Sequence, residues 1–106
     1  MASIVEYYQG DYPYTSTRIL SKLEIENMSS RSELKLMRNE IFARYGHKFE
    51  PNGRMDQHFS NKNWYQPQYE DVTAFLTDIE IQNVNQIRDT EVEVIEAINF
   101  LKRFAI

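Results

Sequence analysis

The sequence predicts an all-α fold: a small single-domain bundle of about four to five helices, with an irregular segment rich in proline and aromatic residues. Two observations carry this prediction. Ser21, Ser30 and Thr77 each stand three positions before a glutamate, which is the spacing of a capping box at a helix N-terminus. After these signals, apolar residues recur at helical spacing. The length of 106 residues fits one domain over 1–106.

The first half of the chain is predicted to hold an extended N-terminal segment, a short helix and a long helix. Residues 1–14 mix tyrosines with a glycine and a proline, which favour extended or turn-rich backbone. A short helix follows Ser21. The central helix covers 31–45 on the spacing of its apolar residues, and Gly46 is expected to end it as a left-handed C-cap.

The second half is predicted to hold a short helix, irregular chain and a final helix. The short helix lies around 54–59. The run NKNWYQPQYEDVT (61–73) is irregular, because its proline blocks a helix. The last helix starts after Thr77 and continues to about position 103, and Arg88-Asp89-Thr90 is expected to break it. Residues 92–106 form a C-terminal helical extension.

Two nine-residue stretches resemble each other. LSKLEIENM (20–28) aligns without a gap with LTDIEIQNV (76–84). The pattern predicts two similar short helices with similar packing, rather than a symmetric pair of binding sites.

Charge is unevenly distributed, and the overall balance argues against a nucleic-acid partner. The net charge is −4, whereas nucleic-acid binders are basic. Positions 31–48 hold five basic and two acidic residues, a net of +3, and positions 70–96 hold one basic and eight acidic residues, a net of −7. These segments are expected to attract each other within the fold; an exposed basic site is the alternative.

Arg38 lies inside the apolar face of the central helix, so its guanidinium needs a partner. The expected partners are Glu24 and Glu80, the two capping-box acids, in a structural clasp; a ligand-binding role is the alternative. Arg44 lies on the rim of the same face, where it is expected to meet the C-terminal acids or solvent, with an anion site as the alternative.

Metal binding and catalysis have little support in the sequence. The only histidines, His47 and His58, match no standard ligand spacing, and the chain has no cysteine. There is no nucleophile elbow and no glycine-rich phosphate loop. We therefore expect no metal, no cofactor and no catalytic residues.

Aromatic residues offer a candidate binding surface. Trp64 and Tyr65, together with Tyr69, Tyr12 and Tyr14, could stack on the apolar faces of a sugar. The alternative, favoured by the small size of the domain, is that Trp64 fills the core beside Phe59. The C-terminal apolar residues, Phe100, Leu101, Phe104 and Ile106, either pack on the core or dock another chain.

Three stretches together identify a family resemblance. ELKLMRNEIFARYGHKF, HFSNKNWYQP and FLTDIEIQNV resemble the YARHG domain, a bacterial family named for its most typical five residues. The resemblance covers residues 12–91. It implies an extracytoplasmic domain of envelope or secreted proteins, without an assigned reaction. Here Phe42 and Tyr45 replace the Tyr and the His of the name, so a general base at the second position would be lost in this chain.

The sequence thus predicts a non-enzymatic helical accessory or interaction module of a bacterial envelope or secreted protein. Its expected partner is a protein or a neighbouring domain, and a cell-wall glycan is the alternative. Glycan binding through Trp64 and the tyrosines is one alternative, and a small hydrolase using His47 or His58 is another. The candidate binding residues are Arg38, Arg44, Tyr45, His47, Trp64 and Tyr65. No apolar run reaches membrane-spanning length. We expect an extracytoplasmic location with the leader removed, and the cytoplasm is the alternative.

Overall fold

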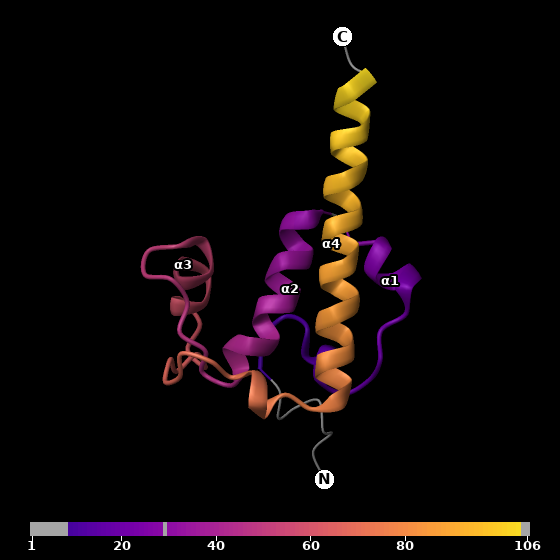
Figure 1. Ribbon diagram of the computed structural model, residues 1–106. Coiled ribbons are helices and arrows are strands. Elements are labelled where there is room, and N and C mark those ends of the chain that lie inside the picture. The colour runs from indigo at the N-terminus through magenta and orange to yellow at the C-terminus, as the bar shows by residue number, and fades with distance from the viewer. Residues whose placement is uncertain (1–8, 29, 105–106) are drawn as a thin grey trace.

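The computed structural model describes residues 9–28 and 30–104, and for Phe104 the backbone alone. Four α-helices and two short 3-10 helices follow one another in these residues (Figure 1). They are η2 (Pro13–Ser16), α1 (Lys22–Glu26), α2 (Arg31–Arg44), α3 (Arg54–Ser60), η3 (Thr73–Phe75) and α4 (Asp78–Phe104). The predicted all-α class is confirmed. Most of the predicted N-terminal segment, residues 1–8, lies outside the described part of the chain.

Local chemistry sets the helix starts. The Ser21 hydroxyl accepts a hydrogen bond from the N–H of Glu24 at 3.1 Å, while the Glu24 carboxylate accepts one from the N–H of Ser21 at 2.7 Å. Thr77 and Glu80 exchange the same two bonds at 3.2 and 2.9 Å. At the start of α2, the Ser30 hydroxyl accepts from the backbone N–H of the third helical residue at 3.1 Å. The three predicted capping residues therefore all cap helices.

Gly46 ends α2 as predicted. Its φ of +83° lies in the left-handed region that favours glycine. A Cβ at this position would lie 2.7 Å from the backbone oxygen of Gln66. This oxygen cannot move aside as the end of a flexible side chain could, so a larger residue does not fit here. The turn also brings the chain into contact with the irregular segment, because Gly46 accepts hydrogen bonds from the N–H groups of Gln68 and Tyr69 at 2.8 and 3.0 Å.

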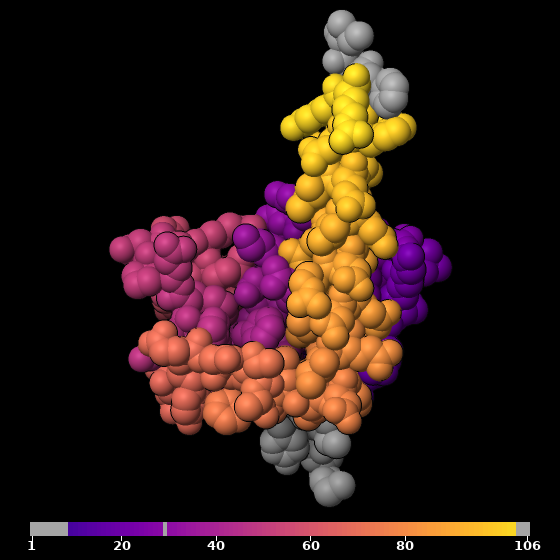
Figure 2. All heavy atoms as spheres, viewed as in Figure 1, coloured from indigo at the N-terminus to yellow at the C-terminus, as the bar shows by residue number. Residues whose placement is uncertain are grey.

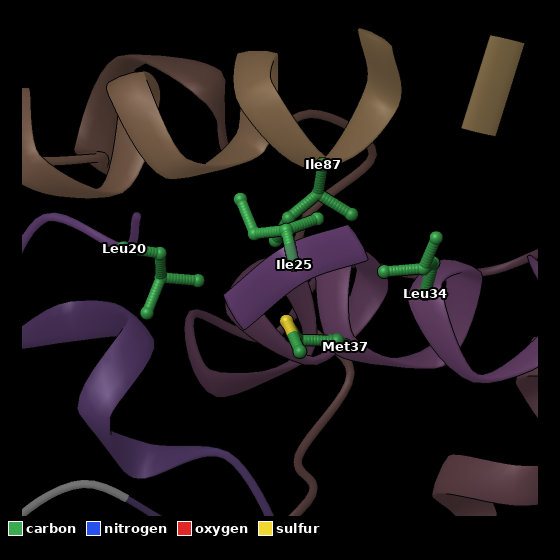
Figure 3. Packing of buried hydrophobic residues seen from close by; sticks show 5 residues of the cluster. All are labelled: Leu20, Ile25, Leu34, Met37 and Ile87. Atoms are coloured by element: carbon green, nitrogen blue, oxygen red, sulfur yellow. The ribbon is translucent and has the colours of Figure 1, made fainter. Parts of the chain in front are cut away.

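The first core cluster lies where α1, α2 and α4 meet. Its buried members come from the chain before α1, from α1 itself, from α2 and from α4: Leu20, Ile25, Leu34, Met37 and Ile87 (Figure 3). Burying an aliphatic side chain of this size contributes about 1.5–3 kcal/mol. α2 and α4 lie side by side (Figure 1), so the predicted attraction between the basic and acidic segments acts along neighbouring helices.

The second cluster joins α2 to α3 and the irregular segment. Phe59 is fully buried at its centre, and the ring of Phe49 stacks on it at 5.3 Å between centroids. Tyr65 is 9% exposed and closes the same cluster from the irregular segment. The proline- and aromatic-rich stretch is therefore irregular in backbone but fixed to the body by its rings.

The two similar stretches do not pack alike, so that prediction was wrong. Ile25 is 1% exposed, whereas Ile81, its equivalent in α4, is 40% exposed. Asn27 is exposed, whereas its equivalent Asn83 is fully buried. The stretches share a cap, but α1 ends after five residues and α4 continues for 27. Their burial differs because the two helices have different neighbours: α1 packs against α4, whereas α4 packs against α2, α1 and η2.

The predicted break at Arg88-Asp89-Thr90 was also wrong. Helix α4 runs without interruption from Asp78 to Phe104, and its Thr90 is buried against the body, with its hydroxyl donating to the carbonyl of Gln86 at 3.0 Å. The C-terminal half of α4 projects beyond the other helices (Figures 1 and 2). Among the described residues, none of the helices combines the length and the apolar character needed to cross a bilayer.

Candidate functional site

The last turns of α2 carry a buried polar network. We use this name for Ser16, Glu40, Arg44, Tyr45 and Glu80. They come from η2, from α2 and its C-cap, and from α4. Charged groups withdrawn from water must be paired and hydrogen-bonded, because an uncompensated buried charge costs several kcal/mol. The bonds of each member therefore show what the network does.

Glu40 holds the N-terminal segment. Its carboxylate accepts hydrogen bonds from the backbone N–H groups of Asp11 at 2.7 Å and Tyr12 at 2.8 Å. Gly10 permits this close approach, because its φ is +108° and a Cβ would lie 2.2 Å from the Glu40 carboxyl carbon. The segment therefore wraps directly over the carboxylate of a residue in α2.

Arg44 is the centre of the network. Its guanidinium donates hydrogen bonds at 2.5–3.0 Å to a carboxylate, two hydroxyls and two backbone carbonyls: Glu40, Ser16, Thr15, Tyr12 and Gln9. Its side chain is 5% exposed. Burial lowers the pKa of Arg44, and the neighbouring Glu40 acts in the opposite direction. The expectation that Arg44 lies on a rim facing the C-terminal acids or solvent was wrong, because η2 and the N-terminal segment cover that rim.

Glu80 extends the network to α4. Its carboxylate accepts from the hydroxyls of Ser16 at 2.7 Å and Tyr45 at 2.6 Å, and from the N–H of Thr77 at 2.9 Å. A capping-box acid is usually exposed, but Glu80 is 1% exposed. Tyr45 stands where the resembled family most typically has His. Both side chains carry a hydrogen-bond donor on a ring, so the replacement keeps a donor at this position.

Arg38 pairs with neither of its predicted partners, Glu24 and Glu80. Its guanidinium donates to the Glu91 carboxylate at 2.6 and 3.2 Å in a bidentate pair between α2 and α4. Glu24 instead accepts two hydrogen bonds from Arg18 at the surface, which together with the Ser21 N–H lowers the pKa of Glu24 to about 2. The prediction failed because helix α4 continues past Thr90 and brings Glu91 alongside Arg38.

The two histidines contact different aromatic rings. The His47 ring lies between Phe42 and Phe49, and its Nδ1 is buried without a partner among the described residues. His58 meets Phe59 edge to face, and burial together with Lys62 lowers the pKa of His58. Within the described ranges, no group of three or more His, Cys, Asp or Glu residues is placed to hold a metal ion.

The predicted aromatic platform is partly buried. Tyr65 donates its hydroxyl to the backbone oxygen of His47 at 2.5 Å, and Trp64 is half-buried with its ring 6.1 Å from that of Phe59. Two nearby rings are exposed instead, Tyr69 and Phe75, at 43% and 46%. These two meet edge to face at 5.0 Å.

A second surface lies on the projecting half of α4. Ile95, Ile98 and Leu101 are 37%, 43% and 66% exposed and share one side of the helix with half-buried Val94. We call these four residues the α4 stripe. At its base lies a groove of about 400 Å³ between the α1–α2 connection and α4. It is lined by apolar Met28, Leu34, Val94 and Ala97 and by charged Glu26, Arg31 and Glu93. Phe100 is also exposed, at 57%, so it does not pack on the core; Ile106 and the Phe104 side chain lie outside the described residues.

The sequence-based prediction missed Ser16, Glu40 and Asn83. Asn83 ties the chain before α1 to α4, because its amide donates to the carbonyls of Thr15 and Arg18 at 2.8 Å. The spacing of Glu40 and Arg44, four residues apart in a helix, was a signal that could have identified their ion pair. No local signal marks Ser16 or Asn83, whose partners are far away in the sequence.

Comparison with protein families matches residues 8–92 to the YARHG domain. The match covers the buried polar network and both core clusters, and it ends where α4 leaves the body. No curated protein and no solved structure matches the chain.

Proposed function

Because this chain belongs to the YARHG domain family, a small domain associated with extracellular proteins, we propose that it is a non-enzymatic helical interaction module of an extracytoplasmic protein. In this proposal the body is a rigid base and the projecting half of α4 docks a protein partner. The α4 stripe is the observation that carries it.

The exposure of the stripe supports the proposal. Three large aliphatic side chains at intervals of three residues, Ile95, Ile98 and Leu101, are between 37% and 66% exposed on one side of α4. Scattered apolar residues are normal on a surface, but a contiguous patch rimmed by charges marks an interaction site. Covering this patch would remove apolar area from water and favour association.

The residues of the family motif support the proposal that the body is a rigid base and that the stripe makes the contact. Glu40, Arg44 and Tyr45 direct their polar groups at the N-terminal segment, η2 and α4. These bonds hold the chain before α1 against two helices, and so fix the direction in which α4 leaves the body. In this proposal the most distinctive residues of the family build the base, and the stripe beyond it makes the contact.

Site-specific photo-crosslinking tests the proposal. A photoreactive amino acid at Ile98 is expected to give one adduct of defined mass when the protein is expressed in its native host. The control places the same amino acid at Glu96, which is exposed and lies about 160° around the helix from Ile98. Equal labelling from both positions, or none from Ile98, would contradict a docking role for the stripe.

A second candidate, glycan binding, is favoured by the exposed pair Tyr69 and Phe75. Their edge-to-face contact holds both rings in place, and rings held in this way can stack on a sugar. Saturable binding to isolated cell walls that is lost in Tyr69→Ala and Phe75→Ala, but kept in the stripe variant Ile98→Ala, would favour this candidate. Loss of binding in Ile98→Ala alone would count against it.

A further inference from the structure

Three residues of the α4 stripe, Val94, Ile98 and Leu101, continue a heptad pattern that begins in the core. Val84, Ile87, Glu91, Val94, Ile98 and Leu101 are separated alternately by three and four residues, the a and d spacing of a helix that packs against another helix. The first three are at most 8% exposed, and α2 is the helix that packs beside them. Helix α2 begins at Arg31, which lines the groove together with Val94 and Ala97. The pattern thus continues past the point where α2 supports it.

The charge of this half of α4 changes sign along its length. Residues 89–96 contain four acidic residues and no basic one, and residues 97–104 contain two basic residues and no acidic one. A parallel pair of such helices would place like charges beside each other. An antiparallel pair places Lys102 and Arg103 of each helix beside the acidic half of the other. The same polarity complements the dipole of a single helix, but the dipole does not account for the exposed stripe.

The groove at the base of the stripe has matching chemistry. Its lining is apolar at Met28, Leu34 and Ala97, and its charged members are Glu26, Glu93 and Arg31, two acids against one base. An aliphatic side chain followed by a base suits this combination, because the apolar part can enter while the ammonium group reaches a carboxylate. Leu101 and Lys102, near the tip of α4, are such a pair.

We propose that two copies of this chain associate antiparallel through residues 92–104 of α4, each placing Leu101 and Lys102 in the groove of the other. This inference rests on the docking role proposed above and names the partner as a second copy. The arrangement is isologous, so one surface serves both copies. Ile98 lies midway between the groove and the tip, and therefore close to the two-fold axis. The groove and the tip are separated by seven residues, about 10 Å along the helix, so each tip reaches the opposite groove when the axis passes near Ile98.

Sedimentation equilibrium from about 1 µM to about 1 mM, a range that covers weak and moderate affinities, tests the association. A monomer–dimer equilibrium is expected, with Ile98→Glu weakening it at least about tenfold. Phe100→Glu is the matched control, since it adds the same charge at an exposed apolar residue about 160° away. Unchanged circular dichroism would show that both variants keep the helix. A monomer throughout the range, or equal weakening by both variants, would overturn the proposal.

Orientation is tested by paramagnetic relaxation between copies. The chain has no cysteine, so Arg31→Cys at the groove carries a single nitroxide label. The labelled chain is mixed with the unsubstituted chain, which carries no nitroxide and is enriched in ¹⁵N. Antiparallel pairing is then expected to broaden the amide signals of residues 101–103 most. Strongest broadening near Val94 would indicate parallel pairing and overturn the inference. A monomeric protein whose Ile98 still cross-links to a different chain would overturn the second copy as partner while leaving the proposed docking function intact. A monomeric protein without any cross-link from Ile98 would overturn both the second copy as partner and the proposed docking function.

Discussion

The guanidinium of Arg44 donates to the carboxylate of Glu40 at 2.8 Å, one turn earlier in α2, and the two side chains are only 5% and 2% exposed. Pairs at this spacing are common on helix surfaces and contribute little there. This pair is covered by η2 and the N-terminal segment, which supply the remaining hydrogen-bond partners. The pair therefore connects α2 to η2 and to the N-terminal segment, instead of stabilising α2 alone.

Replacing Arg44 by methionine is expected to destabilise the fold by about 3–5 kcal/mol, because Glu40 would keep a buried charge without its cation. Urea unfolding monitored by circular dichroism measures this change. Arg18→Met is the control: its pair with Glu24 is at the surface, with Arg18 51% exposed, and should change stability by at most about 1 kcal/mol. Similar losses for both variants would show that burial of the Arg44 pair has no special effect.

Gly10→Ala is expected to release the N-terminal segment from Glu40. The substitution forces a side chain into a left-handed backbone conformation, at about 1–2 kcal/mol, and places its Cβ 2.2 Å from the carboxylate. Hydrogen exchange of the Asp11 and Tyr12 amides should accelerate. Gly53→Ser adds a side chain at an ordinary φ of −73° and at a helix N-cap, so exchange at those amides should stay unchanged. Unaltered exchange in Gly10→Ala would contradict the role of Glu40 in holding the N-terminal segment.

Arg38 and Glu91 are expected to couple by about 0.5–3 kcal/mol in a double-mutant cycle of Arg38→Met and Glu91→Gln. The pair is bidentate, and its side chains are 22% and 10% exposed. Lys22 and Glu93 provide the comparison, since they also join α4 to another helix but are 3.8 Å apart and more than half exposed. Their coupling should be close to zero. Any ligand bound by the domain should still bind to a folded Arg38→Met variant, and selective loss of binding would assign Arg38 a functional role.

Stability is expected to fall as the pH rises above about 10. Burial raises the pKa of Tyr12, and the hydrogen bond from its hydroxyl to Glu33 raises it further; burial also raises the pKa of Tyr14. An unfolded tyrosine ionises near pH 10, so above that pH the unfolded state loses protons first and is favoured. The stabilising contribution is complete below about pH 10 and is lost as the pH approaches the folded pKa values. Urea unfolding between about pH 8 and pH 11.5 measures this decline.

Tyr12→Phe removes one of these groups and should make the decline shallower than in the unsubstituted chain. Tyr69→Phe is the control because its ring is 43% exposed. An identical decline in all three proteins would indicate that Tyr12 does not contribute to it.

Much of the local structure could be predicted from short windows of sequence. The capping residues Ser21, Ser30 and Thr77 and the helix stop at Gly46 were predicted correctly, because each acts on backbone groups within about four residues. The family was also identified from contiguous motifs. The helical wheel correctly placed Arg38 on the face of α2 that packs against the body. A wheel describes a single helix, however, so it could not identify Glu91 of α4 as the partner of Arg38.

The sequence by itself determined the helix starts, the stop at Gly46 and the family of this protein. Only the tertiary structure decided that Arg38 pairs with Glu91, that Arg44 is enclosed by the N-terminal segment, and that Ile25 is buried while Ile81 is exposed. The physical reason is range. Capping and turn chemistry depend on groups a few residues apart, whereas the bond from Ser16 to Glu80 joins residues 64 positions apart and exists only once η2 has packed against α4.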